Sequence, residues 1–130
     1  EFIEKARFNR KALGGGMRQS GILAAAGIVA LNEMPKKIIK DHQNASTLAK
    51  GLNAISGISI DLEKVKTNII YFKLDHSKID SVTLINSMLK KNIKFFELGP
   101  NWFRLVTHAG INEEDIDHVL IQFKDLFSKI

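Results

Sequence analysis

A long apolar segment without charge is the feature that most restricts how this chain can fold. Between Arg18 and Glu33 no residue is charged, and Ile, Leu, Val and Ala fill most of the positions. If residues 17–34 form a helix, it is apolar on every side rather than along one stripe, so it must be covered on every side. We therefore infer a missing domain or a partner subunit that covers this helix.

The rest of the composition excludes several classes of protein. The 130 residues are long enough for one domain with its own core. The absence of cysteine rules out a disulfide scaffold, a thiolate metal site and a cysteine nucleophile. The longest uncharged apolar run, residues 21–31, is shorter than the roughly 20 residues that span a bilayer. No secretory signal pattern opens the chain, and we expect a cytoplasmic protein.

The net charge of +5 does not indicate nucleic-acid binding. The lysines are dispersed, and the tightest cationic cluster is formed by Arg7, Arg10, Lys11 and Arg18. A nucleic-acid module usually concentrates its charge on one element beside exposed aromatic residues. We therefore expect no nucleic-acid partner.

The N-terminal half of the sequence predicts three helices. Residues 2–12 form the first, which Gly14–Gly16 ends, and residues 17–34 form the second. Pro35 suits the first turn of the third, over residues 35–55. Its buried stripe is predicted to be Ile38, His42, Ala45, Ala49 and Leu52.

The C-terminal half predicts a small α+β unit. Residues 58–62, 68–74, 94–98 and 102–107 are predicted strands, the last two joined in a hairpin. Ser77 and Asp80 resemble a capping box that opens a helix to about residue 91, with Val82, Ile85, Met88 and Leu89 inside. Asn112 caps a last helix, whose buried stripe is predicted to be Ile116, Val119, Leu120, Phe123, Phe127 and Ile130. The result is a mostly antiparallel sheet with helices on one face.

The Gly-rich turn before the apolar helix is a candidate anion site. Free backbone N–H groups and the helix dipole attract phosphate, and Arg18, in the first turn of the predicted helix, adds a bidentate donor. The motif lacks the features of a Walker or dinucleotide fingerprint. The alternative is a flexible turn with a solvated arginine.

Arg104 is the second candidate, because it lies in the middle of a predicted strand among apolar residues. Trp102 and Val106 share its face. A guanidinium in such surroundings is costly unless it meets a carboxylate or a phosphate. The alternative is an arginine on an edge strand that extends to water. The four histidines show no metal-ligand spacing, and no catalytic triad or paired acids are apparent.

Two segments resemble one known family. Residues 10–19, Arg-Lys-Ala-Leu-Gly-Gly-Gly-Met-Arg-Gln, resemble the Arg-Lys-x-x-Gly-Gly-Gly-Met-Arg-Gln signature of low-specificity L-threonine aldolases. Residues 104–108, Arg-Leu-Val-Thr-His, resemble a strand near the C-terminus of that family. Residues 41–45 and 65–69 also resemble family segments at the expected spacing. The resemblance covers essentially the whole chain.

The resemblance implies an α/β enzyme of the pyridoxal-phosphate-dependent transferase fold (fold type I), usually a homotetramer. Such an enzyme splits L-threonine or L-allo-threonine into glycine and acetaldehyde. It implies that Arg104 binds the substrate carboxylate and that Arg18 and Lys11 lie near the phosphate of pyridoxal 5'-phosphate, across a subunit interface.

No Ser-x-x-Lys-Gly segment, which holds the family's Schiff-base lysine, is present. We therefore expect the C-terminal portion of the enzyme, with that lysine and an N-terminal large domain upstream. Residues 1–34 would end the large domain, residues 35–57 would form a connecting helix and residues 58–130 the small domain. This portion alone is expected to be inactive.

Two alternatives remain open. One is a related pyridoxal-phosphate-dependent β-eliminating lyase, or an aldolase for another β-hydroxy amino acid. The other is a non-enzymatic module that binds an amino-acid carboxylate through Arg104 without a cofactor.

Overall fold

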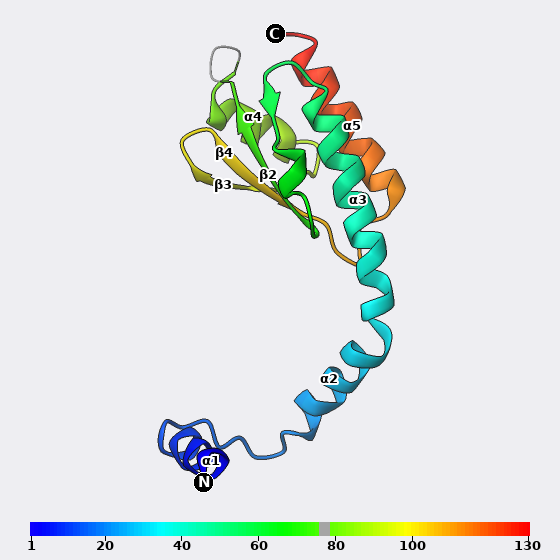
Figure 1. Cartoon of the computed structure of the whole chain (residues 1–130). Helices are drawn as coiled ribbons and strands as arrows, with labels where there is room; N and C mark the ends of the chain where they lie inside the picture. Colours follow the sequence, from blue (N-terminus) through cyan, green and yellow to red (C-terminus); the bar gives the residue numbers. More distant parts are fainter. Residues whose placement is uncertain (76–78) are drawn as a thin grey trace. The chain divides into compact units, whose positions relative to one another are not determined.

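The computed structural model describes residues 1–75 and 79–130, which form two compact units, Glu1–Pro35 and Lys36–Ile130. Figure 1 shows the elements in chain order: α1 (Phe2–Ala12), α2 (Gly21–Glu33), α3 (Pro35–Asn53), β1 (Ile58–Ser59), the 3-10 helix η1 (Leu62–Lys64), β2 (Ile69–Leu74), α4 (Ser81–Leu89), β3 (Phe96–Gly99), β4 (Trp102–Val106) and α5 (Glu113–Phe127).

The first unit consists of α1, a Gly-rich turn and α2, and no residue of either helix is buried. Gly14 has a φ of 79°, a left-handed conformation that favours glycine, and α1 ends just before it as predicted. The second helix begins at Gly21 rather than at residue 17, because Gln19 has a φ of 49° and cannot continue a right-handed helix. Arg18 therefore lies in the turn before α2, and its prediction in the first helical turn was wrong.

The second unit is an antiparallel four-stranded sheet in the order β1-β2-β4-β3. Figure 1 shows α3 and α5 running side by side against the sheet. Side chains alternate along the strands, so Ile70, Phe72 and Leu74 of β2 are buried, as are Phe103 and Leu105 of β4. Phe72 and Phe103 stack with ring centroids 4.8 Å apart, and Phe123 of α5 contacts Phe72 edge-on. This aromatic cluster joins the sheet to the helical layer.

The predicted buried face of α5 is confirmed except at Ile130, which lies beyond the end of the helix and is 51% exposed. The predicted faces of α3 and α4 are corrected. Asn112 caps α5 in a reciprocal capping box with Asp115. In α3 only the second half is buried; Ile38 is 45% exposed, and Leu48 joins the core although the prediction omitted it.

The start and inner face of α4 differ from the prediction. Asp80 is its N-cap and accepts a hydrogen bond from the Thr83 N–H, so the helix begins at Ser81. This start sets the phase of the helix, and Leu84 and Met88 point inward while Val82 and Leu89 are exposed. The predicted role of Ser77 lies outside the described residues.

The strands follow the sequence pattern closely except at the first. β2 and β4 lie within the predicted ranges, and β3 ends at Gly99, one residue beyond its predicted end. β1 has only two residues, and the chain then turns into η1. Among the described residues, no helix is long and apolar enough to span a bilayer.

Candidate functional site

Arg104 lies in the centre of the sheet face that the helices of its unit do not cover. Its strand β4 pairs with β2 on one side and β3 on the other, so the structure excludes the alternative of an arginine on an edge strand. Tyr71 of β2 and Phe96 of β3 are its direct cross-strand partners, and Trp102 and Val106 flank it along β4. These four neighbours are between 44% and 65% exposed. The sheet therefore presents one cation within an apolar and aromatic surface.

The guanidinium of Arg104 has an unused hydrogen-bond donor. Its Nε atom is buried and has no partner among the described residues. Its Cζ atom lies 5.5 Å from the centroid of the Phe96 ring, within the range of a cation–π contact. Because a buried donor without an acceptor is unfavourable, this arginine is suited to a bound anion with oxygen acceptors.

A polar network lies at the end of β4, three residues beyond Arg104. The Thr107 side chain is buried, and its hydroxyl donates to the Asp41 carbonyl oxygen of α3 at 2.7 Å. The Asn68 side-chain amide donates to the Thr107 carbonyl oxygen at 2.6 Å. Nearby, the Asn44 amide donates to the Ile111 carbonyl oxygen at 2.9 Å. The three segments that resemble the family in this unit, near residues 41–45, 65–69 and 104–108, thus meet in one hydrogen-bonded network.

The Gly-rich turn of the first unit holds the other two predicted site residues, Lys11 and Arg18. A β-carbon at Gly16 would lie 2.8 Å from Cδ and 3.2 Å from Nζ of Lys11. The glycine therefore leaves room for an ammonium group directly beside the backbone of the turn. Both cations are exposed, and no described carboxylate forms an ion pair with either. This chemistry fits a phosphate group. Arg104 belongs to the other unit.

Two carboxylates away from these residues, Asp80 and Glu113, have structural roles. The pKa of Asp80 is lowered because the hydroxyl and the N–H of Thr83 donate to its carboxylate at the start of α4. The pKa of Glu113 is lowered by the hydrogen bond from the Lys40 ammonium between α5 and α3. Over residues 1–75 and 79–130, no cluster of acidic residues and histidines could hold a metal ion.

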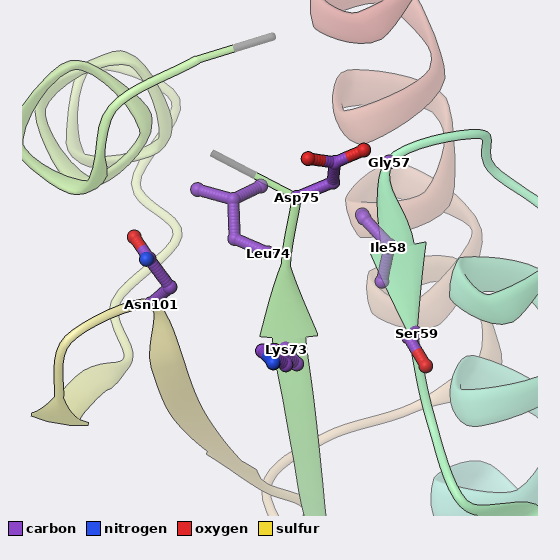
Figure 2. A pocket seen from close by; sticks show the side chains of 7 residues that line it. All are labelled: Gly57, Ile58, Ser59, Lys73, Leu74, Asp75 and Asn101. Atoms are coloured by element: carbon purple, nitrogen blue, oxygen red, sulfur yellow. The ribbon is translucent and has the colours of Figure 1, made fainter. Parts of the chain in front are cut away.

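A hollow at the end of β2, with a volume of about 620 Å³, lies apart from these residues. Figure 2 shows the side chains that line it, which are Gly57, Ile58, Ser59, Lys73, Leu74, Asp75 and Asn101. None of the predicted site residues is among them. The open sheet face around Arg104, rather than this hollow, is the candidate site of the second unit.

The sequence did not identify Tyr71 and Phe96 as neighbours of Arg104. The alternation within β4 indicated Trp102 and Val106, because residues two apart on a strand share a face. Neighbours across strands depend on the pairing register, and the sequence specifies the register only once the partner strands are known. The polar network does have a signal in the sequence, because the sequence resembles the family in all three segments that form the network.

Comparisons with known proteins agree with these observations. A family model described as beta-eliminating lyase matches residues 1–75. The chain is 38% identical over 128 residues to a probable low-specificity L-threonine aldolase 2 of Arabidopsis thaliana, covering 98% of this chain and 36% of the plant protein. It is 30% identical to the low specificity L-threonine aldolase of Escherichia coli strain K12, covering 99% of this chain and 37% of that protein. The chain thus spans about a third of the length of these relatives.

Solved structures share the fold of this chain. A mutant of C-DES with glycine covalently linked to its PLP cofactor superposes with a TM-score of 0.65 at 20% identity, covering 82% of this chain and 28% of that one. An aminotransferase from Escherichia coli gives a TM-score of 0.54 at 17% identity, covering 70% of this chain and 24% of that one. The predicted fold class is confirmed.

Proposed function

The chain belongs to the beta-eliminating lyase family, and from this premise we propose that it is the C-terminal portion of a pyridoxal-phosphate-dependent L-threonine aldolase. The proposed enzyme is a carbon–carbon lyase that cleaves L-threonine or L-allo-threonine to glycine and acetaldehyde. The relatives with threonine aldolase names, matched along nearly the whole chain, support this substrate class. The observation that carries the proposal within the molecule is Arg104, whose buried Nε lacks a partner on an open sheet face.

The residues of the first unit fit the phosphate of the cofactor. Lys11 lies beside the glycine backbone of the turn, and Arg18 follows the same turn. We propose that these two cations hold the phosphate of pyridoxal phosphate. When bound, the cofactor supplies the electron sink for the electron pair of the broken Cα–Cβ bond. No segment of this chain matches the family's Schiff-base lysine, which the proposal assigns to the large domain of the full-length enzyme.

The proposed role of Arg104 is to bind and orient the substrate. A planar guanidinium holds a carboxylate through two parallel hydrogen bonds, and these fix the rotation of the amino acid about its Cα–C bond. That orientation decides which bond at Cα is aligned for cleavage. The aromatic and apolar neighbours of Arg104 reduce competition from water, so each hydrogen bond to the carboxylate becomes stronger.

Two features of the assembled enzyme are part of the proposal. The apolar α2 would be covered by the large domain and by other subunits of a homo-oligomer, and the resemblance favours a tetramer. The proposed location is the cytoplasm. A related β-eliminating lyase is the alternative within the family, and its substrate would carry a leaving group on Cβ in place of the β-hydroxyl.

Arg104→Lys in the full-length enzyme tests the proposal. Lysine keeps the charge but loses the planar pair of donors, so the carboxylate is no longer held in one orientation. We expect catalytic efficiency on L-threonine to fall by about thirtyfold to a thousandfold, equivalent to about 2–4 kcal/mol. The visible absorbance of the bound cofactor and the melting temperature should stay close to those of the parent.

Steady-state kinetics with L-threonine and with a β-substituted amino acid separates the possible results. Near-normal threonine cleavage by Arg104→Lys would remove the carboxylate role. A parent enzyme that eliminates the β-substituent but does not cleave threonine would favour the alternative lyase.

A further inference from the structure

Phe96 is an exposed aromatic residue whose position the packing of the core does not explain. It lies on the edge strand β3 and is 65% exposed. Its ring contributes to none of the stacked or edge-on aromatic pairs of the core. A ring this exposed adds little to the stability of the fold through burial, so burial does not account for an aromatic residue at this position.

The register of the sheet places this ring directly against Arg104. Phe96 and Arg104 are paired across β3 and β4, and the guanidinium carbon lies 5.5 Å from the ring centroid. Paired residues on neighbouring antiparallel strands have their side chains on the same face, so the contact follows from the backbone register. On the opposite side, Tyr71 of β2 pairs with Arg104. Aromatic residues thus lie across from Arg104 on both neighbouring strands, and the Phe96 ring is the one in contact with the guanidinium.

The contact limits where the guanidinium can lie. An arginine side chain on an open surface samples many rotamers, and binding an anion in one geometry costs that freedom. A cation held near an aromatic ring has fewer accessible positions, and arginine is especially suited to this arrangement because its guanidinium is planar. Since no described residue accepts from the buried Nε, the ring holds the group without occupying its donors.

We propose that Phe96 is a positioning residue for Arg104, holding its guanidinium with the Nε–H donor free for the substrate carboxylate. The inference rests on the proposed function, because it assumes that the anion bound by Arg104 is the carboxylate of the amino-acid substrate. It adds a residue outside the two segments that carry the resemblance to the family. In this arrangement Phe96 acts through Arg104 and does not itself bind the substrate polar groups.

The test uses three substitutions in the full-length enzyme. Phe96→Leu keeps an apolar side chain and removes the aromatic face. Phe96→Tyr keeps the face and should rescue function. Leu98→Ala, on the same strand and 53% exposed, is the matched control for a loss of apolar surface on β3.

We expect Phe96→Leu to lower catalytic efficiency on L-threonine by about two- to fivefold, the factor that corresponds to an exposed cation–π contact. The loss should appear mainly as a raised KM and a weaker affinity for glycine measured by calorimetry, with the melting temperature and the cofactor content unchanged. Phe96→Tyr and Leu98→Ala should match the parent. In an Arg104→Lys background the effect of Phe96→Leu should shrink, because residues that act through one contact are not additive.

Each other result overturns the inference. Parent-like glycine affinity in Phe96→Leu, failure of Phe96→Tyr to rescue, or an undiminished effect of Phe96→Leu beside Arg104→Lys would each show that the ring does not position the guanidinium. In these cases a large loss from Arg104→Lys alone would leave the proposed function intact. A parent that neither cleaves threonine nor binds glycine would overturn the proposed function and the inference together.

Discussion

At the scale of single residues, the informative feature is a cation that the rest of its unit does not neutralise. Arg104 is half-buried on β4, and no described acceptor meets its Nε. By contrast, the lysines that form ion pairs, such as Lys64 with Asp61 and Lys66 with Glu63, are largely exposed. Exposed ion pairs contribute little to stability. The arginine whose Nε has no described acceptor therefore indicates a site more clearly than the ion-paired lysines do.

Arg18 carries a prediction at this scale. In the full-length enzyme, Arg18→Ala should weaken binding of pyridoxal phosphate by about tenfold to a hundredfold, because a charge-assisted hydrogen bond contributes roughly 1.5–3 kcal/mol. Equilibrium dialysis of the cofactor measures the loss, with Arg7→Ala, another exposed arginine of the first unit, as the control. Unchanged cofactor affinity in Arg18→Ala would make Arg18 a structural or interface residue.

At the scale of elements, the packing of α3 on α5 depends on one glycine. A β-carbon at Gly51 would lie 2.5 Å from Cδ2 and 3.1 Å from Cγ of Leu120. These distances are shorter than van der Waals contact, so Leu120 occupies the space that a side chain at residue 51 would need. The lack of a side chain at Gly51 therefore lets the two helices approach.

Because α3 and α5 lie so close at Gly51, we expect Gly51→Ala to change the stability of the protein in opposite directions with and without Leu120→Ala. Gly51→Ala should improve helix propensity by about 1 kcal/mol but overpack the interface by about 1–3 kcal/mol, for a net loss of about 1 kcal/mol. With Leu120→Ala already present, the same change should stabilise the protein by about 1 kcal/mol. Urea unfolding measures both values, and Lys50→Ala, an exposed neighbour, should change stability by less than about 0.5 kcal/mol. The same sign in both backgrounds would contradict the prediction.

At the scale of the whole molecule, the two units differ in whether they bury their own apolar side chains. The second unit has a continuous core built on Phe72, Phe103 and Phe123. In the first unit no residue of α1 or α2 is buried, and Ile22 and Leu31 are 76% and 77% exposed. A contiguous apolar surface of this kind usually marks an interface. The relatives are nearly three times as long as this chain.

This difference predicts how the 130-residue polypeptide behaves when produced by itself. We expect it to self-associate through α2 and to sediment as species heavier than the 14.6 kDa monomer. Replacing both Leu23 and Leu31 by lysine should shift the distribution toward the monomer. Val82→Lys, which changes a 66% exposed side chain of α4, should leave it unchanged. Sedimentation velocity over a range of concentrations measures the oligomeric state. An unsubstituted polypeptide that remains monomeric would show that α2 is not an associating surface.

Several elements were predictable because their sequence signals are local. Glycines ended α1, Asn112 and Asp115 opened α5, and the alternation of apolar residues gave β2 and β4. These features depend on backbone conformations and caps within a few residues, so no distant contact is needed to predict them. The fold class was also accessible, through the resemblance of the Gly-rich turn and the Arg-Leu-Val-Thr-His strand to one family.

The neighbours of Arg104 and the burial of each helix depend instead on how distant segments pack together. The sheet order placed β4 between β2 and β3, which excluded an edge position and brought Tyr71 and Phe96 to the guanidinium. The physical reason is that strand order and register arise from packing between segments far apart in the chain, whereas propensity and capping act over a few residues.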